Sequence, residues 1–247
     1  MLERTFIHIQ GIGLKTERTL WERGIRTWQD FLSHRRTVFS PARDEMVRTD
    51  LKTSFACRGD ITFFQERLSS GEMWRVFEAF KRRAAYLDIE TNGHQGIDEI
   101  TVIGIYDGNR VQTFVNGNNL DAFEVAIAEY DLVITFNGSS FDLPIIRRSF
   151  PNITLPAVHI DLRHLLKRLG YRGGLKRIEK QLGIVRDTDI DGLNGYDAVL
   201  LWNAYAWGDQ TALARLIKYN TADIVNLKPL MEIGYQEMKT RLLSFPV

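Results

Sequence analysis

The chain has 247 residues, of which 44% are hydrophobic and 26% are charged. This composition is typical of a globular protein and excludes a disordered chain, and the length allows one substantial core and a smaller appended module. No stretch approaches about 18 uncharged apolar residues, and the first ten residues hold no long apolar run. We therefore expect neither a membrane-spanning nor a secreted protein.

The formal net charge of +1 conceals an uneven distribution along the chain. Residues 1–83 hold 16 Lys and Arg against 11 Asp and Glu, a charge of +5, whereas residues 84–247 hold 16 against 20, a charge of −4. A basic segment before an acidic body suits a polyanion-binding surface beside a cation site. The single cysteine, Cys57, excludes an internal disulfide and a cysteine-rich zinc site, and favours a cytoplasmic location.

The first predicted elements are two short helices, around residues 16–23 and 27–32. Residues 33–70 show no clear periodicity and receive no assignment. Trp74, Phe77 and Phe80 recur at a spacing of three, which predicts one apolar helix face leading into the next domain.

After residue 83 the pattern changes to short apolar runs that predict strands. The five runs are residues 84–89, 100–106, 111–115, 132–136 and 157–160. Helical stretches are predicted over 120–129 and 139–149, and beyond residue 161 the pattern is helical with interruptions at 170–174 and 187–195. A meander followed by alternating strands and helices predicts an α/β fold with a mixed sheet covered by helices. We expect a small, mostly helical accessory segment over 1–83 and one main domain over 84–247.

The first predicted strand carries two acids in an apolar context. Asp88 and Glu90 are two residues apart, so both side chains point to the same face. Two like charges in a partly buried sheet repel each other unless a cation neutralises them, and a divalent metal ion is the obvious candidate. The alternative is an edge strand with a solvated polar face.

Two further acids follow the later strands. Asp142 comes after Asn137-Gly138 at the end of the fourth run, where it either ligates a metal ion or caps the next helix. Asn137 either fixes the turn or contacts a terminal nucleotide. Asp161 ends the fifth run and either supports the metal ligands or caps a helix.

Tyr219 and Asp223 are four residues apart in a late helical run, which places them on one helix face. Such pairs also occur in ordinary helix packing with a solvated acid. The order Asp-x-Glu, then Asn with Phe-Asp, then Tyr-x-x-x-Asp resembles the DEDDy exonucleases of the ribonuclease-H-like superfamily. Within them the chain is similar to the predicted YprB-type exonuclease family. The resemblance covers nearly all of residues 84–230 and includes the segments 174–179 and 200–202, which carry little chemistry.

The resemblance implies a five-stranded ribonuclease-H-like sheet and a metal-dependent 3′–5′ exonuclease acting on DNA or RNA at a single-stranded region or a 3′ end. It further implies two divalent cations, Mg²⁺ or Mn²⁺, held by Asp88, Glu90, Asp142 and Asp223, with Tyr219 orienting the attacking water. The chemistry agrees, because these hard cations prefer oxygen ligands. Thr91 and Lys176 are added as substrate-binding candidates.

The segment around Gly11-Ile12-Gly13 is similar to a helix-hairpin-helix unit. In that motif Gly11 and Gly13 allow a tight turn and the next helix start offers amides to a phosphate, with Lys15 close enough to assist. The alternative is a plain helical hairpin. Residues 163–186 are rich in Lys and Arg, which is typical either of a substrate-contacting surface or of a solvated helix face.

Other motifs are rejected. Residues 187–192 imitate the start of an EF-hand, but Ala198 stands where the glutamate ligand is required. The histidines form no recognised zinc spacing, and His94 is interpreted as an exposed loop residue. Two other functions remain open: a nucleic-acid-binding protein that uses the fold as a scaffold, and an oligonucleotide phosphoesterase. Neither the choice between DNA and RNA nor a protein partner can be inferred.

Overall fold

The computed structural model describes residues 1–93 and 99–244, so His94 lies outside the described residues. The chain divides into two compact units. The N-terminal unit comprises Met1–Lys81 together with the last residues of the chain from Met238, and the sheet unit comprises Arg82–Glu237. Each unit is described by itself.

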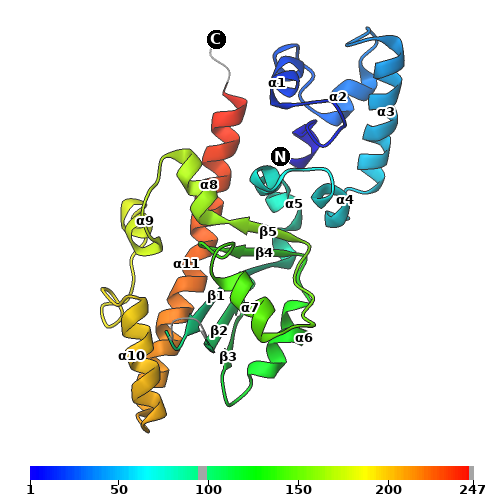
Figure 1. Ribbon diagram of the computed structural model, residues 1–247. Helices are drawn as coiled ribbons and strands as arrows, with labels where there is room; N and C mark the ends of the chain where they lie inside the picture. The colour runs from blue at the N-terminus through cyan, green and yellow to red at the C-terminus, as the bar shows by residue number, and fades with distance from the viewer. Residues whose placement is uncertain (94–98, 245–247) are drawn as a thin grey trace. The chain divides into compact units, whose positions relative to one another are not determined.

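The sheet unit contains one five-stranded sheet in the order β3-β2-β1-β4-β5 (Figure 1). Its strands are β1 (Ala84–Thr91), β2 (Ile100–Tyr106), β3 (Val111–Val115), β4 (Leu132–Thr135) and β5 (Val158–Asp161). The first three strands form an antiparallel meander, and β1-β4 and β4-β5 pair in parallel. The predicted α/β fold with a mixed five-stranded sheet is confirmed.

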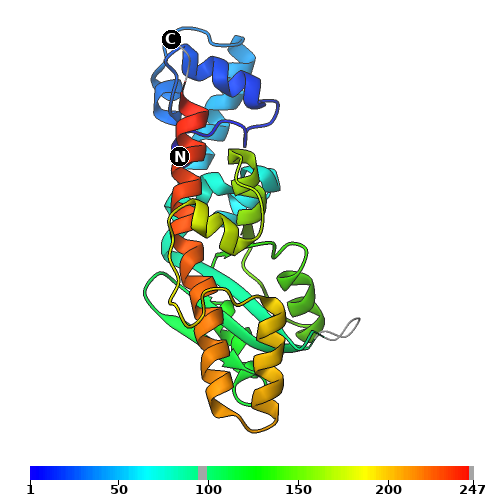
Figure 2. The same cartoon turned by 90° about the vertical axis from the view of Figure 1, so that its left-hand side faces the viewer.

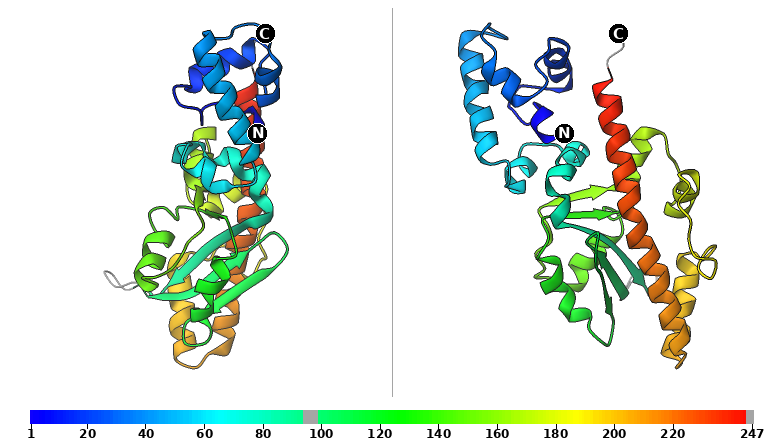
Figure 3. Two further views of the ribbon diagram at one scale, coloured as in Figure 1. Left: turned by 90° about the vertical axis from the view of Figure 1, so that its right-hand side faces the viewer. Right: turned by 180° about the vertical axis from the view of Figure 1, so that it is seen from behind.

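Helices cover both faces of this sheet. They are α6 (Phe123–Ile127), α7 (Asp142–Ser149), α8 (Leu162–Leu169), α9 (Leu175–Gln181), α10 (Gly195–Ala206) and α11 (Gln210–Leu243), with the short 3-10 helix η4 (Leu120–Ala122) before α6. Odd-numbered residues of β1 and β2, such as Leu87 and Ile103, pack with α6 and α7 in one apolar cluster. Val102 packs on the opposite face with residues of α10 and α11, and α11 runs along this face of the sheet (Figure 3). Because side chains alternate along a strand, Asp88 and Glu90 lie on the α11 face.

Helices α10 and α11 lie side by side (Figures 1 and 2). The connection between them contains Gly208, whose φ of 107° is one that residues with a Cβ rarely adopt. Leu216 of α11 and Ala198 of α10 are both buried in the same apolar cluster. Within the described residues, no helix has the length and apolar character needed to cross a membrane.

The N-terminal unit is mostly helical. Its elements are η1 (Leu2–Arg4), α1 (Leu14–Glu22), α2 (Trp28–Ser33), α3 (Pro41–Ala56), α4 (Ile61–Gln65), η2 (Ser70–Val76) and α5 (Phe77–Phe80), followed at the boundary by η3 (Lys81–Arg83). The stretch left unassigned from sequence contains α3, whose start is fixed by the Ser40 side chain and by Pro41 in the first turn. Trp74, Phe77 and Phe80 are all buried on helical segments, Trp74 in the 3-10 helix η2 and the two phenylalanines in α5.

Candidate metal centre

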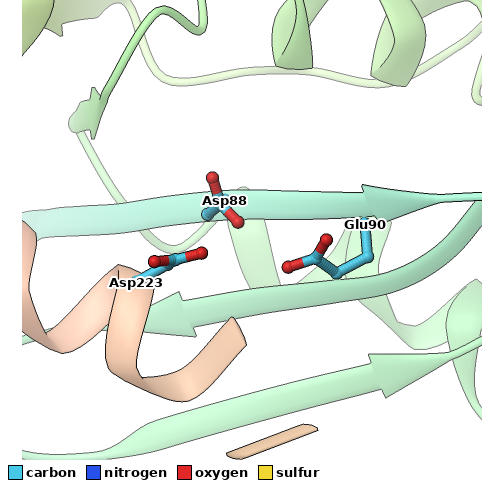
Figure 4. A group of neighbouring side chains, drawn as sticks. All are labelled: Asp88, Glu90 and Asp223. Carbon is cyan, nitrogen blue, oxygen red and sulfur yellow. The ribbon is translucent and has the colours of Figure 1, made fainter. Parts of the chain in front are cut away.

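Three carboxylates from distant parts of the chain converge beside β1. Asp88 and Glu90 project from β1 and Asp223 projects from α11, and one oxygen of each lies within 4.8 Å of the others. Figure 4 shows the three side chains turned toward one another. Glu90 and Asp223 are buried and Asp88 is partly exposed. The arrangement concentrates negative charge at a point that solvent screens weakly.

The pKa values of these acids reflect that crowding. Burial raises the pKa of Asp88 well above its usual range, and the charges of Asp223, Asp142 and Glu90 raise it further. Burial and the nearby charge of Asp223 likewise raise the pKa of Glu90. Burial raises the pKa of Asp223, although Arg186 and Lys176 oppose this effect. A cation placed among these oxygens would remove the repulsion.

Asp142 lies next to this group, in the first turn of α7, but is not one of the three acids whose oxygens all fall within that distance. Pairing between β1 and β4 covers only Ala84–Tyr86, and beyond it the Ile89 amide donates to Asp142 Oδ1 at 3.2 Å. Burial raises the pKa of Asp142 to about 7, and Asp223 also raises it. Asp142 is therefore tied to β1 and is electrostatically part of the acidic group.

Asn220 of α11 connects the two acids of β1. Its Nδ2 atom donates to Asp88 Oδ2 at 3.1 Å and lies 3.5 Å from Glu90 Oε1. This side chain rests on Gly104 of β2, where an added Cβ would lie 2.1 Å from Asn220 Oδ1. Gly104 therefore leaves the space that Asn220 needs to hold both carboxylates.

Arg186 holds Asp223 from the other side. Its Nη2 atom lies 2.5 Å from Asp223 Oδ1, and its Nε and Nη2 atoms donate to the two oxygens of Glu179 at 2.6 Å each. Asn226 adds a hydrogen bond of 3.1 Å to Glu179. Arg186 and Glu179 are almost fully buried, so the guanidinium is a fixed cation beside the acidic group.

Sequence reasoning missed Arg186 and treated Glu179 as carrying little chemistry. Arg186 stands in a loop after α9 and is 37 residues from Asp223 in the sequence, so no local spacing connects them. The only signal in the sequence is that Arg186 ends the basic stretch 163–186.

Tyr219 lies one turn before Asp223 on α11 and is buried. Lys176 donates to the Tyr219 hydroxyl and to the backbone oxygen of Leu193, and its ammonium lies 4.1 Å from the centre of the Tyr219 ring. Burial and the charges of Asp223 and Glu90 raise the pKa of Tyr219, so the hydroxyl keeps its proton. Burial lowers the pKa of Lys176, while Asp223 and Glu90 oppose that shift.

Asp161 organises the turn between β4 and α7. It caps α8 through the Arg163 amide at 3.0 Å and accepts the Asn137 and Ser139 amides at 2.8 and 3.1 Å. Asn137 has a φ of 69°, a conformation that asparagine tolerates, and its Oδ1 accepts from Arg163. Asp161 therefore caps a helix, as one alternative predicted, and it also orders the turn that precedes Asp142. Support of the metal ligands stays a prediction. Thr91 is buried at the end of β1, where the pairing with β2 is irregular.

The remaining candidates lie in the N-terminal unit. Gly11 has a φ of 75° and its carbonyl accepts from Arg43 at 2.8 Å, whereas Gly13 forms the N-cap of α1. Lys15 is exposed in the first turn of α1.

In the sheet unit, Lys218 forms ion pairs with Asp187 and Asp189 at 2.9 and 2.8 Å. This agrees with the rejection of an EF-hand at residues 187–192.

Fold and site together define an α/β protein with a carboxylate group suited to a cation on one face of a mixed sheet. A family model described as RNase_H superfamily matches residues 85–235, which is more than half of the chain. The protein therefore belongs to the RNase_H superfamily, an assignment that supports nucleic acid as the substrate and a nuclease as the general activity.

A search of curated proteins finds no match to this chain. Among solved structures, the chain is similar to the family B DNA polymerase from the hyperthermophilic archaeon Pyrobaculum calidifontis, with 14% identity and a TM-score of 0.49. The match covers 66% of this chain and 27% of the polymerase chain. This similarity is too low to indicate a shared activity.

Proposed function

We propose that the protein is a metal-dependent 3′–5′ exonuclease that hydrolyses phosphodiester bonds of DNA or RNA. The observation that carries the proposal is the convergence of Asp88, Glu90 and Asp223 with Asp142 beside them. Burying several like charges together destabilises a fold, and the pKa values of these acids are raised because burial disfavours their charged forms and neighbouring carboxylates repel them.

Mg²⁺ or Mn²⁺ fits this set of donors, because both ions prefer oxygen ligands and four carboxylates can balance two divalent charges. Asp88, Glu90, Asp142 and Asp223 would hold the two ions. When bound, such ions lower the pKa of a coordinated water and stabilise charge on the oxygens of an in-line displacement at phosphorus.

The surrounding residues are assigned roles that their contacts support. Asn220 orients the two acids of β1, and Arg186 with Glu179 fixes the position of Asp223. The protonated Tyr219 hydroxyl, held by Lys176, orients the attacking water and keeps it in line with the phosphorus. No covalent intermediate is required.

The finer assignments belong to the same proposal and rest on sequence motifs. They are the DEDDy type, the YprB-type family, the 3′–5′ direction, and the division into an accessory segment over 1–83 and a catalytic domain over 84–247. Asn137 and Thr91 are proposed to contact the terminal nucleotide. The lone cysteine supports a cytoplasmic location.

The N-terminal unit is proposed to bind backbone phosphate through a helix-hairpin-helix-like turn at Gly11 and Gly13, with Lys15 assisting. Replacing both glycines with bulkier residues should weaken binding to long nucleic acid. Unchanged affinity in a folded variant would leave this segment as a scaffold.

The activity test uses end-labelled single-stranded DNA and RNA with Mg²⁺, with Mn²⁺ and with a chelator. The wild type should shorten the strands from the 3′ end only with metal. Asp88→Ala and Asp223→Ala should lower the rate at least about 10³-fold, since several kcal/mol of charge stabilisation are lost. Glu129→Ala, at an exposed acid of the sheet unit, is the matched control and should retain full activity. Equal cleavage by all four proteins would eliminate the proposed centre.

A further inference from the structure

A cavity lies in the sheet unit. Its volume is about 680 Å³, and its walls come from the turn after β4, from α8 with the loop that follows it, from α9 and from the first residue of α10. Three cationic side chains, Arg163, Lys167 and Arg172, line it, and none of the described residues in its lining is acidic. All three are exposed. A concave surface lined by cations suits a polyanion.

Two aromatic residues complete the walls. Phe136 and Tyr171 line the same cavity and are half-buried. The Tyr171 hydroxyl donates to Glu237 Oε1 at 2.7 Å, which anchors the ring at the wall. Arg163 is likewise anchored, because its Nη1 lies 2.5 Å from Asn137 Oδ1. Cations beside aromatic rings are the usual surface for single-stranded nucleic acid, in which bases stack and phosphates pair with cations.

The cavity shares two elements with the carboxylate group. The segment that follows β4 contributes Asn137 to the cavity wall and Asp142 to the acids. Helix α9 contributes Ile178 to the wall and Lys176 to the contact with Tyr219. The cavity therefore lies on the segments that also carry Asp142 and the contact of Lys176 with Tyr219.

We infer that this cavity binds the single-stranded nucleotides adjacent to the cleaved end. Arg163, Lys167 and Arg172 pair with the backbone phosphates, and Tyr171 and Phe136 pack against the bases. The inference rests on the proposed nuclease function and adds to it the residues that hold the unpaired strand beyond the cleaved end, over a length of several nucleotides. A solvated basic helix face needs neither a cavity free of acids nor an anchored aromatic ring.

The test compares the variant R163Q/K167Q/R172Q with R110Q/R147Q/R148Q, which removes the same charge at exposed positions of the sheet unit outside the cavity. Fluorescence anisotropy measures binding to labelled 20-mers of single-stranded DNA and of single-stranded RNA in chelator at several salt concentrations. At about 0.1 M salt the cavity variant should bind at least about tenfold more weakly. Its slope of log affinity against log salt should fall by about two, since each lost phosphate contact removes about 0.7. The control variant should stay within about twofold of the wild type.

A cleavage measurement separates this inference from the proposed function. Lengthening the substrate from two to twelve nucleotides should raise kcat/KM for the wild type, and this gain should shrink at least about tenfold in the cavity variant. Two outcomes would overturn the inference without affecting the proposed nuclease function. One is an equal loss of binding in both variants, and the other is a cavity variant that binds and cleaves long strands like the wild type. The opposite outcome is also distinct. If the wild type cleaves nothing and binding is lost in the cavity variant but not in the control variant, the proposed nuclease function is refuted and the binding site stands.

Discussion

Each unit of the molecule buries a group of charges around one arginine, and the two groups differ in how the charge is balanced. In the N-terminal unit Arg75 is fully buried and pairs with Glu17 at 2.9 Å and with Glu72 at 2.6 Å. Glu17 also accepts the Phe6 amide at 2.7 Å. Each acid of this group thus has a cationic partner within the protein.

The group in the sheet unit is not balanced in this way. Arg186 is shared between Glu179 and Asp223, and it leaves Asp88, Glu90 and Asp142 to be offset by Lys176 and by neutral donors. Repulsion between neighbouring acids adds to burial in raising the pKa values of these acids, whereas burial raises the pKa of Glu17 in the N-terminal unit and Arg75 opposes that shift. Burial of charge alone therefore does not mark a functional site. An excess of buried charge of one sign does.

Breaking the balanced group should produce the largest effect on stability. Arg75→Met leaves two buried carboxylates without their cation, and the free energy of unfolding should fall by about 3–5 kcal/mol. Urea unfolding followed by tryptophan fluorescence measures it, because Trp21, Trp28 and Trp74 are buried in this unit. The exposed control Arg58→Met should change stability by less than about 0.5 kcal/mol. A loss no larger than that control would show that the buried pairs do not stabilise this unit.

Buried histidines and the buried acids of the carboxylate group should respond to pH in opposite directions. Burial lowers the pKa of His8 in the N-terminal unit to about 4, so the unfolded chain binds the extra proton and stability falls as pH drops from 6.5 to 4, by about 3 kcal/mol. Burial raises the pKa of Asp142 in the sheet unit to about 7, so metal-free protein loses stability as pH rises from 3.8 to 7. Amide hydrogen exchange in chelator, read separately for α3 and for β1, measures both trends. Because burial also lowers the pKa of His159 in the sheet unit to about 4, the contribution of Asp142 is read as the difference between the wild type and Asp142→Asn. No difference between these two proteins would contradict the account.

Loosening Arg186 should weaken metal binding without unfolding the protein. In Glu179→Gln the guanidinium loses its charged partner and pairs with Asp223 alone, where it competes with a cation. Mn²⁺ affinity should fall about 10–100-fold, the usual effect of changing a group that orients a metal ligand. Arg186→Lys should behave similarly, because lysine cannot bind two carboxylates through a planar fork. The exposed neighbour variant Lys180→Gln is the control, and an equal loss there would refute the positioning role.

The smallest expected effect is an increase in stability rather than a loss. Asp88→Asn keeps an acceptor for Asn220 but removes one of the repelling charges, so the metal-free protein should gain on the order of 1 kcal/mol of stability. In the balanced group the corresponding change, Glu17→Gln, should instead destabilise. Thermal unfolding in chelator measures both. If Asp88→Asn and Glu17→Gln change the stability in the same direction, the two buried groups of charges do not differ in the way described.

The sheet could be predicted from sequence because its signal is local. The runs at 100–106 and 111–115 coincide with β2 and β3, and period two alone placed Asp88 and Glu90 on one face. Helix α3 was missed because Met46 of this helix is exposed, whereas Asp44 and Ser54 are buried, which destroys the apolar periodicity. The spacing of Trp74, Phe77 and Phe80 correctly indicated a buried helical face, although part of it is a 3-10 helix.

Sequence motifs could predict only part of the site. The acids of β1 and Asp223 could be selected from their order in the chain, and the structure places them together. The contacts of Arg186 with Asp223, of Lys176 with Tyr219 and of Asn220 with Asp88 join residues 37, 43 and 132 positions apart. Such pairs depend on the packing of α9 and α11, which no spacing in the sequence encodes.

The central claim is that the acidic group of the sheet unit binds divalent cations jointly. A titration with Mn²⁺, with free Mn²⁺ measured by its electron paramagnetic resonance signal, tests it directly on the full chain. The account predicts two Mn²⁺ per wild-type chain and weaker binding of at most one in Asp88→Ala and in Asp223→Ala, with both variants folded. No binding by the wild type, or equal binding by all three proteins, would contradict it.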